Sequence, residues 1–580
     1  MKLMPGGRAA SLFAALHFTV GCLGSTPSSL LSATKTTPAD LNYPSGTPFP
    51  GDYGGQYRPQ VHYSAPQNFM SDPNGIFRDA SGTWHLYYQY NPLGLSFGNQ
   101  HWGHATSKDL YHWASQPIAL GPPNRHTTAL FSGSTVVDRN NTSGLFPNQD
   151  NGVVSVFTLA GRDPDGGFGG PQVQSLAYSH DGGFNFQFYE HNPVINSTSN
   201  QFRDPRVMAY KDHWVMVIAY SRDFTIGIYT SPNLLDWTHA SNFSLHGLLG
   251  AQWECPNLIQ MPYIDEECHR QDDVWTLFVN INPGGPLGGA VVQYFPGSFN
   301  GTHFKPVDSA ARTVDSGKDY YAMQFFNNIG PGTEVEYPVS IAWASNWQYT
   351  QLVPTGQEGW RSSMSLPRRH YMTKIKGVGW KLVSQPYNLE RVMGDTLAVQ
   401  KNVTKEVVAV EFSGVKSNAV FWEVNITGIP ERALRSLSLN VSFVSPSTTE
   451  SVRLAYVFGG VDFDLYGGDT PFSLDRGGAK GFDHRFFTHR FSVSSPHDDG
   501  TWSASGVLDR SLLEVFIHGG IETVTSTFFT QEPVAVVLFS LSPDLPKGLS
   551  VDLRVVGLNS AWDNQASHDG LVYGNRTIKG

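Results

Sequence analysis

The sequence predicts an all-β protein in which a β-propeller is followed by a C-terminal β-sandwich. Gly (59), Pro (37) and aromatic residues (13%, against 15% charged) are abundant, which is typical of turn-rich β proteins rather than helical bundles. From Tyr57 onward, short apolar or aromatic runs alternate with Gly, Asn, Asp and Pro turns. Beyond about residue 395, polar and apolar residues alternate with a period of two, as in strands with one solvent-facing side.

A weak internal repeat places the propeller in the first part of the chain. Residues 106–113 (TSKDLYHW) are echoed by residues 230–237 (TSPNLLDW), and each segment follows an apolar run and ends on an aromatic residue. The outer hairpin of a propeller blade has this form. We therefore expect a propeller over residues 57–394 and a sandwich over residues 395–580. Residues 387–393 (YNLERVM) are the best candidate for a short connecting helix.

The first residues predict a secreted protein. Lys2 and Arg8 precede the apolar residues 9–23, and small residues follow, so residues 1–25 are interpreted as a signal peptide, with a non-targeting tail as the alternative. Residues 26–56 are rich in Ser, Thr, Pro and Gly and predict a flexible lead-in. The net charge of −10 is spread thinly, and no later run has the length of a membrane span. We expect neither a nucleic-acid nor a membrane partner.

Asn-x-Ser/Thr sequons are dense enough to predict several N-glycans on exposed loops. Cys255 and Cys268 are the cysteines that remain after the leader, so a disulfide-stapled scaffold is excluded, although a bridge between these two stays open. We find no cluster with metal-ligand spacing and expect neither a metal nor a cofactor. The sequons lie at Asn140, Asn141, Asn196, Asn242, Asn300, Asn402, Asn425, Asn440 and Asn575.

Three acidic segments lie in stiff, turn-prone contexts. They are residues 68–75 (NFMSDPNG), 202–205 (FRDP) and 253–256 (WECP), and in each a proline closely follows the acid. Taken singly, each segment has a simpler explanation. Residues 72–75 are first of all a turn sequence, Arg203 and Asp204 could form an ordinary ion pair in a loop, and Glu254 could be a surface acid. Hydrolysis of a glycoside with retention, however, needs one carboxylate as nucleophile and another as proton donor. Their occurrence in order is what favours such a site.

Together the three segments resemble glycoside hydrolase family 32, the invertase, inulinase and levanase family. The resemblance runs from about residue 57 to residue 530 and is closest to secreted invertases of fungal or yeast type. It implies a five-bladed propeller followed by a β-sandwich, and retaining hydrolysis of terminal β-fructofuranosides, chiefly sucrose. Further matching segments are residues 88–92 (YQYNP), 102–105 (WGHA), 131–134 (FSGS), 342–347 (AWASNW) and 509–516 (DRSLLEVF).

Carried over by position, the resemblance implies that Asp72 is the nucleophile and Glu254 the general acid/base. Asp204 would stabilise the transition state through the fructose hydroxyls, and Arg203 would orient the Asp204 carboxylate. Because three clustered acids cannot all ionise without repulsion, we expect an acidic pH optimum. The resemblance further implies a substrate-binding set of Asn68, Phe69, Met70, Ser71, Gln89, Phe97, Phe131, Ser132, Arg203 and Trp343.

Two positions depart from the family pattern. Ser71 stands where the family usually has Asn, and a hydroxyl cannot form the two-ended hydrogen-bond bridge of an amide. Plant-type fructosyltransferases of the family often carry Ser at this position. Phe97 stands where many relatives have Trp, which removes one N–H donor near the site entrance. Neither departure removes a predicted catalytic carboxylate.

Four hypotheses therefore follow from the sequence. The leading hypothesis is an invertase, with short inulin-type fructans as further substrates. A fructosyltransferase, which passes the same fructosyl intermediate to a sugar hydroxyl, is the nearest alternative, and an exo-inulinase is another. A carbohydrate-binding protein on the same scaffold is less favoured because all three acids are present. The expected partner is a small sugar, and a homo-oligomer is compatible with the sequence.

Overall fold

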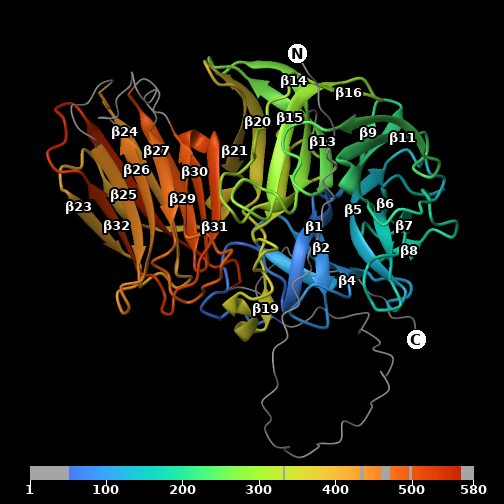
Figure 1. The fold of residues 1–580 in the computed structure, drawn as a ribbon, viewed down its shortest axis with the longest axis horizontal. Coiled ribbons are helices and arrows are strands. Elements are labelled where there is room, and N and C mark those ends of the chain that lie inside the picture. Colours follow the sequence, from blue (N-terminus) through green and yellow to red (C-terminus); the bar gives the residue numbers. More distant parts are fainter. Residues whose placement is uncertain (1–50, 331–332, 431–436, 459–469, 496–499, 563–580) are drawn as a thin grey trace, which may run out of the picture. The chain divides into compact units, whose positions relative to one another are not determined.

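The computed structural model describes residues 51–330, 333–430, 437–458, 470–495 and 500–562. The predicted signal peptide, most of the lead-in and the sequon at Asn575 lie outside these residues. Within them the chain forms a five-bladed β-propeller followed by a β-sandwich, as predicted (Figure 1).

Each propeller blade is an antiparallel meander whose first strand lies innermost. Connections that range from tight turns to longer loops join successive strands, and each blade is built from a contiguous stretch of sequence. The first blade contains β1 (Asn68–Arg78), β2 (Trp84–Asn91), β3 (His101–Ser107) and β4 (Trp113–Leu120). The second contains β5 (Thr128–Asp138), β6 (Gly152–Gly161), β7 (Gln172–Ser179) and β8 (Gln187–Phe188). The third contains β9 (Phe202–Tyr210), β10 (His213–Tyr220), β11 (Thr225–Ser231) and β12 (Thr238–Ser244).

The last two blades join through one parallel bridge between Tyr263 and Met372. The short strand β19 (Trp360–Arg361) pairs in parallel with β1, which ties the end of the propeller back to its beginning. The fourth blade contains β13 (Trp253–Ile264), β14 (Arg270–Ile281), β15 (Val291–Phe299) and β16 (Phe304–Pro306). The fifth contains β17 (Tyr321–Phe325), β18 (Val339–Trp343), β20 (Arg368–Ile375) and β21 (Gly379–Pro386).

The sandwich packs two six-stranded sheets around one apolar core. Its strands alternate as the sequence predicts: in β25, every second side chain from Leu437 to Phe443 is buried. Tyr456 stacks on Trp502 inside this core, with ring centroids 3.9 Å apart. One sheet contains β22 (Met393–Gln400), β33 (Ser550–Leu558), β24 (Ala419–Thr427), β29 (Trp502–Asp509), β30 (Leu512–Ile517) and β31 (Glu522–Thr527). The other contains β23 (Val407–Glu411), β32 (Val536–Leu541), β25 (Leu437–Val444), β26 (Ser451–Phe458), β27 (Pro471–Asp475) and β28 (Arg490–Ser494).

The connection between the two folds is shorter than a helix. A single 3-10 turn, η3 (Leu389–Arg391), stands where the sequence predicts a connecting helix, and β22 then begins at Met393 and pairs with β33. Among the described residues, no helix has the length and apolar character needed to cross a membrane. The other 3-10 turns are η1 (Ser221–Asp223), η2 (Pro354–Glu358) and η4 (His518–Gly520).

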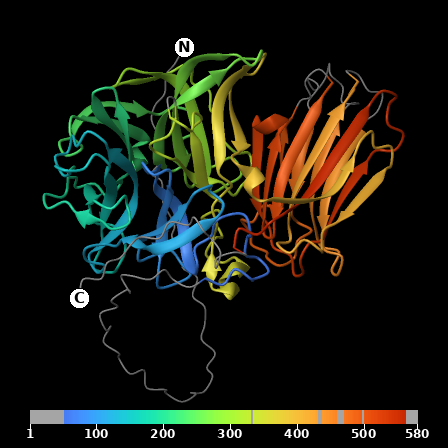
Figure 2. The ribbon, with the colours of Figure 1, turned by 180° about the vertical axis from the view of Figure 1, so that it is seen from behind.

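Buried charges join the propeller to the sandwich. Arg368 of β20 contacts Glu514 of β30 at 2.6 Å and Asp315 at 3.0 Å. His62 contacts Asp509 of β29 at 2.8 Å. We call these five residues the interface cluster. Figure 2 shows from behind that the sandwich lies beside the last blade of the propeller.

Candidate active site

The innermost strand of every blade carries a β-bulge. In each case two residues of the inner strand lie opposite one residue of its neighbour, which re-aims the side chains around the bulge. The five bulges fall at residues 71–72, 131–132, 204–205, 255–256 and 322–323. Each bulge contributes a pocket-lining residue or adjoins one, so a single irregularity repeated five times builds the pocket.

The acidic segments are therefore bulged strands rather than free turns. Asp204 (φ 65°) and Cys255 (φ 44°) adopt left-handed backbone conformations that non-glycine residues rarely occupy. At Gly75 (φ 49°), close packing as well as the backbone conformation requires glycine. A Cβ atom at this position would lie 2.4 Å from Thr135 Oγ1, so only glycine fits between β1 and β5.

The pocket has a volume of about 260 Å³ and opens at the end of the propeller axis. It brings together all three predicted acids with predicted residues from two further motifs. The predicted residues that line it are Ser71, Asp72, Gln89, Phe97, Phe131, Ser132, Arg203, Asp204 and Glu254. Five more lining residues are Cys255, Asn282, Tyr321, Trp347 and Gln351.

Asp72 is poorly supplied with hydrogen-bond donors. Its Oδ2 accepts a bond of 2.9 Å from Ser132 Oγ, whereas its buried Oδ1 has no partner among the described residues. Burial and the nearby Asp204 carboxylate raise the pKa of Asp72 to about 7. This carboxyl group therefore holds a proton far more tightly than an exposed aspartate does.

Asp204 has more partners but is also crowded by negative charge. Its Oδ2 accepts a bond of 3.0 Å from the backbone N–H of Cys255, and Cys255 Sγ lies 3.6 Å from the same oxygen. Burial raises the pKa of Asp204 to about 6, with Arg203 opposing the shift and Glu254 adding to it. Burial also raises the pKa of the Cys255 thiol, which stays protonated beside these acids.

Arg203 pairs with Glu254 rather than with Asp72. Its Nη2 and Nε donate to Glu254 Oε1 at 2.8 and 3.0 Å, and its Nε lies 4.0 Å from Asp204 Oδ2. The Tyr321 hydroxyl donates to the other oxygen of Glu254. The side chains of Gln201 and Gln252 each accept a 3.0 Å bond from Arg203 and fix its plane. Glu254 is thus held by two donors, one on each oxygen.

Four predicted substrate-binding residues lie outside the pocket lining. Met70 is fully buried, and its sulfur accepts a bond from the backbone of Ala65. Phe69 and Trp343 are buried behind Trp347, with ring centroids 6.0 and 4.7 Å from it. Asn68, also outside the lining, uses its amide to bond the carbonyl of Pro92. These side chains support the pocket from behind, and a role in direct substrate contact stays a prediction.

Sequence reasoning missed several lining residues for different reasons. Trp347 lies in the quoted segment 342–347, and the choice of Trp343 over Trp347 followed the motif rather than the direction of the side chain. Asn282 was not chosen by itself, although the loop that contains it, residues 280–285, is expected from the sequence to belong to the acceptor region next to Ser71 and Phe97. Tyr321 begins β17 and Gln351 lies in the connection between β18 and β19; neither carried a sequence signal, because only the fold brings them to the pocket.

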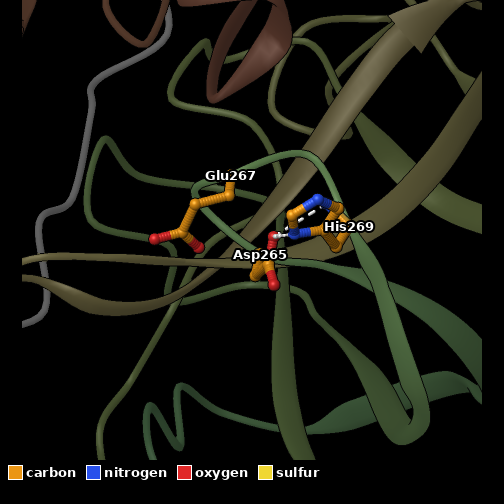
Figure 3. Close-up of side chains that lie close together, drawn as sticks. All are labelled: Asp265, Glu267 and His269. Carbon is orange, nitrogen blue, oxygen red and sulfur yellow. Dashed lines mark hydrogen bonds and ion pairs between the residues drawn. The ribbon is translucent and has the colours of Figure 1, made fainter.

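One group of possible metal ligands lies away from this pocket. Asp265, Glu267 and His269 sit together at the turn between β13 and β14 (Figure 3). The turn itself accounts for the contact, since Asp265 Oδ1 accepts a 2.8 Å bond from the His269 N–H, and Asp265 N donates to His269 O at 3.0 Å.

Cys255 and Cys268 are unpaired, so the bridge left open by the sequence does not form.

A pocket at the propeller axis, with three carboxyl groups in different environments and an aromatic rim, defines a glycoside hydrolase. A model of the "Glycosyl hydrolases family 32 N-terminal domain" matches residues 62–386. The chain belongs to glycosyl hydrolase family 32.

Similar proteins cover most of the chain. An extracellular exo-inulinase from Meyerozyma guilliermondii is 39% identical over 81% of this chain and 90% of its own length. An invertase from Kluyveromyces lactis is 36% identical over 81% of this chain and 87% of its own length. The structure of a fructofuranosidase from Schwanniomyces occidentalis, complexed with fructose, superposes with a TM-score of 0.75 at 34% identity, covering 88% of this chain and 99% of that one. The family resemblance predicted from the sequence is confirmed.

Proposed function

We propose that this enzyme hydrolyses terminal non-reducing β-D-fructofuranosyl units with retention, chiefly sucrose to glucose and fructose. The observation that carries the proposal is the meeting of Asp72, Asp204 and Glu254 with Arg203 in one pocket. Relatives named invertase and fructofuranosidase support the choice of substrate.

In the proposed reaction, an Asp72 carboxylate oxygen attacks the anomeric carbon of fructose. The bond from that carbon to the bridging oxygen breaks, and Glu254 donates its proton to the leaving oxygen. Water then attacks the fructosyl–Asp72 ester while Glu254 takes up the proton of the water. Asp204 binds fructose hydroxyls through the cationic transition state. Arg203 supports both steps because it contacts Glu254 and lies beside Asp204.

The pocket requires one proton and one free carboxylate at the same time. Three carboxyl groups face a single arginine, so full ionisation would leave uncompensated negative charge in a partly buried site. The raised pKa values of Asp72 and Asp204, about 7 and about 6, mean that the site retains protons into the mildly acidic range. We therefore keep the expectation of an acidic optimum: above about pH 7 the pocket loses the proton that the leaving oxygen requires, whereas at low pH Asp72 is protonated and cannot attack.

The test is to incubate the purified protein with sucrose and measure glucose and fructose over time, with Asp72→Ala as control. Equal release of both sugars by the unsubstituted protein, lost in the variant, is expected. The first-formed anomer of fructose, observed by NMR, must be β if the configuration is retained. Sugar binding without cleavage would instead support the carbohydrate-binding alternative.

Transfer of fructose to a second sugar is the competing activity, and Ser71 is the observation that favours it. Ser71 lines the pocket next to Asp72, at the position where the family usually has Asn. At high sucrose concentration, transfer releases glucose in excess of fructose and forms trisaccharide. Ser71→Asn is expected to reduce this excess if Ser71 loosens control of the incoming water. Exo-inulinase activity is a further candidate, supported by the Meyerozyma relative.

We also propose that the protein is secreted and carries N-glycans. The extracellular relatives support the first point. Exposed sequon asparagines, such as Asn140, Asn196 and Asn300, support the second.

The proposed domain division, a catalytic propeller over 57–394 and a sandwich over 395–580, follows the change of strand pairing at β22. Homo-oligomer formation stays a prediction.

A further inference from the structure

Two buried amide side chains hold the carbonyl group of Cys255, the residue that follows Glu254. Asn280 Nδ2 donates to Cys255 O at 2.7 Å, and Asn257 Nδ2 donates to the same oxygen at 3.2 Å. Both asparagines are buried, and neither lines the pocket. They lie behind its wall, so any part that they have in the reaction acts through Cys255 and its neighbours.

Asn280 is the direct cross-strand partner of Glu254. The two residues lie opposite each other in the register of β13 and β14, and side chains paired in this way project on the same face of a sheet. Asn280 Oδ1 is buried and has no hydrogen-bond partner among the described residues. A buried amide oxygen without a partner costs free energy, so stability alone does not explain why an asparagine stands here.

Asn257 joins the bulge next to Glu254 to the bulge of the following blade. Its Nδ2 also donates to Met323 O at 2.9 Å, and its Oδ1 accepts a 3.4 Å bond from the Phe325 N–H. Met323 belongs to the bulge of β17, which begins at Tyr321, and the Tyr321 hydroxyl donates to Glu254. One amide therefore ties together the two bulges that carry Glu254 and the tyrosine in contact with it.

The two amides maintain a backbone conformation that is unfavourable by itself. Cys255 has a φ of 44°, in the left-handed region that non-glycine residues rarely occupy. Its N–H donates to Asp204 Oδ2 at 3.0 Å, while its carbonyl is held by the asparagines. Without these bonds, relaxation to a negative φ would rotate the peptide group between Glu254 and Cys255. Glu254 would then move relative to the leaving oxygen.

We propose that Asn257 and Asn280 are positioning residues for the general acid/base of this enzyme, because they fix the Cys255 carbonyl and so the direction in which Glu254 projects. This inference rests on the proposed function. Neither amide gains or loses a proton in the reaction. Their removal should therefore weaken proton donation by Glu254, which depends on exact geometry, more than it weakens the attack of Asp72.

The test compares Asn280→Leu with the unsubstituted enzyme on sucrose and on p-nitrophenyl β-D-fructofuranoside. Leucine keeps the branched shape of asparagine but removes the donor. The ratio kcat/KM reports formation of the fructosyl–Asp72 ester, for which sucrose needs a proton on its leaving oxygen, whereas p-nitrophenolate leaves without one. We expect kcat/KM to fall about tenfold for sucrose and less than about threefold for the aryl substrate.

Asn257→Leu supplies a second, independent variant and should show the same dependence on the leaving group. Asn192→Leu is the matched control, since Asn192 Nδ2 donates to the backbone carbonyl of Leu176 at 2.8 Å in the second blade, away from the pocket. Its substitution should leave both substrates within about twofold of the unsubstituted enzyme.

A double substitution separates positioning of Glu254 from a general loss of structure. In the Glu254→Gln background, Asn280→Leu should lower kcat/KM for sucrose by less than about twofold more, because no proton donor is left to position. Equal losses on the two substrates, no loss on either, or a further tenfold loss in that background would overturn the inference and leave the proposed function intact. An unsubstituted enzyme that cleaves neither substrate would instead remove the proposed function itself.

Discussion

The active-site pocket and the interface cluster both contain clustered acids and an arginine, yet the pKa values of their carboxyl groups are shifted in opposite directions. In the pocket, Asp72 and Asp204 have raised pKa values although they border a cavity. In the interface cluster, Asp509 and Glu514 are completely buried, and burial favours their protonation. Their ion-pair and hydrogen-bond partners outweigh that effect and lower both pKa values.

The supply of donors explains the contrast. Asp509 accepts bonds from the backbone N–H groups of Gln60, Val61 and His62 as well as from the His62 ring. Burial opposes the charge on His62, but Asp509 and Glu514 raise its pKa to about 9. Asp72 accepts one bond from the Ser132 hydroxyl and a long contact of 3.9 Å from the Cys255 thiol, both on the same oxygen. Burial alone thus does not decide whether an acid is ionised, whereas the number of groups that compensate its charge does.

The sharpest test of the contrast exchanges one glutamate for glutamine in each region. Glu254→Gln removes the proposed proton donor, and kcat/KM for sucrose should fall roughly 10²- to 10⁴-fold. Glu514→Gln makes the same chemical change in the interface cluster and should leave kcat/KM of the folded enzyme within a few-fold. If Glu254→Gln retained more than a tenth of the activity, its assignment would be wrong.

Removing the central cation of the interface cluster should destabilise the fold. Arg368→Met leaves Asp315 and Glu514 buried without the guanidinium between them, at a cost of about 3–5 kcal/mol in the free energy of unfolding. The measurement is urea denaturation at neutral pH, followed by intrinsic fluorescence. The exposed pair of Arg490 and Asp475 offers a control, because Arg490→Met should cost less than about 1 kcal/mol. Similar losses in both variants would contradict the distinction.

The two regions should also respond to pH with opposite signs. The pKa of Asp72 is raised in the folded state, so its contribution to stability is present below about pH 4 and is lost as the pH rises to about 7. Asp72→Asn avoids this loss. The free energy of unfolding of the variant should therefore exceed that of the unsubstituted protein by roughly 2–4 kcal/mol at pH 8, with little difference at pH 4.

Asp509 supplies the reverse case. Its pKa is lowered on folding, so its contribution is present above the unfolded pKa and is lost as the pH falls through the folded value. Asp509→Asn should therefore destabilise the protein more at pH 7 than at pH 3. Thermal unfolding curves across this pH range measure both effects, and parallel slopes for the two variants would show that the pKa directions are wrong.

The smallest expected effect concerns the hydroxyl that contacts Glu254. Tyr321→Phe removes one of the two side chains that donate to Glu254 and orient it, so kcat/KM for sucrose should fall about tenfold. Tyr349→Phe removes a buried hydroxyl that bonds Asp319 between the propeller and the sandwich, and it serves as the matched control. An equal fall of kcat/KM in both variants would contradict a local role for Tyr321.

The sequence predicted the architecture and the carboxylates because both leave local signals. Period-two alternation in strands such as β25 and the repeated Asp-Leu/Asn-Leu hairpins report the fold directly. Asp72, Asp204 and Glu254 lie in motifs with fixed neighbours. Tyr321 left no comparable signal, because its place in the pocket depends on which blades lie side by side. The bulges were also hidden, since a Pro–Asn–Gly segment reads equally as a turn and as an interrupted strand.

The backbone bonds that Asp509 accepts have a consequence for how the enzyme is made. Val61 donates its backbone N–H to Asp509, which lies 448 residues later in the chain. The segment around Val61 leads into β1, the strand that carries Asp72. At about 5–20 residues per second, a ribosome needs roughly 20–90 s to reach Asp509 after making Val61. Until then the nascent propeller lacks the acceptors that anchor its first strand. Cleavage of sugar should consequently begin only after the last domain has been synthesised, whatever the state of the pocket before that moment.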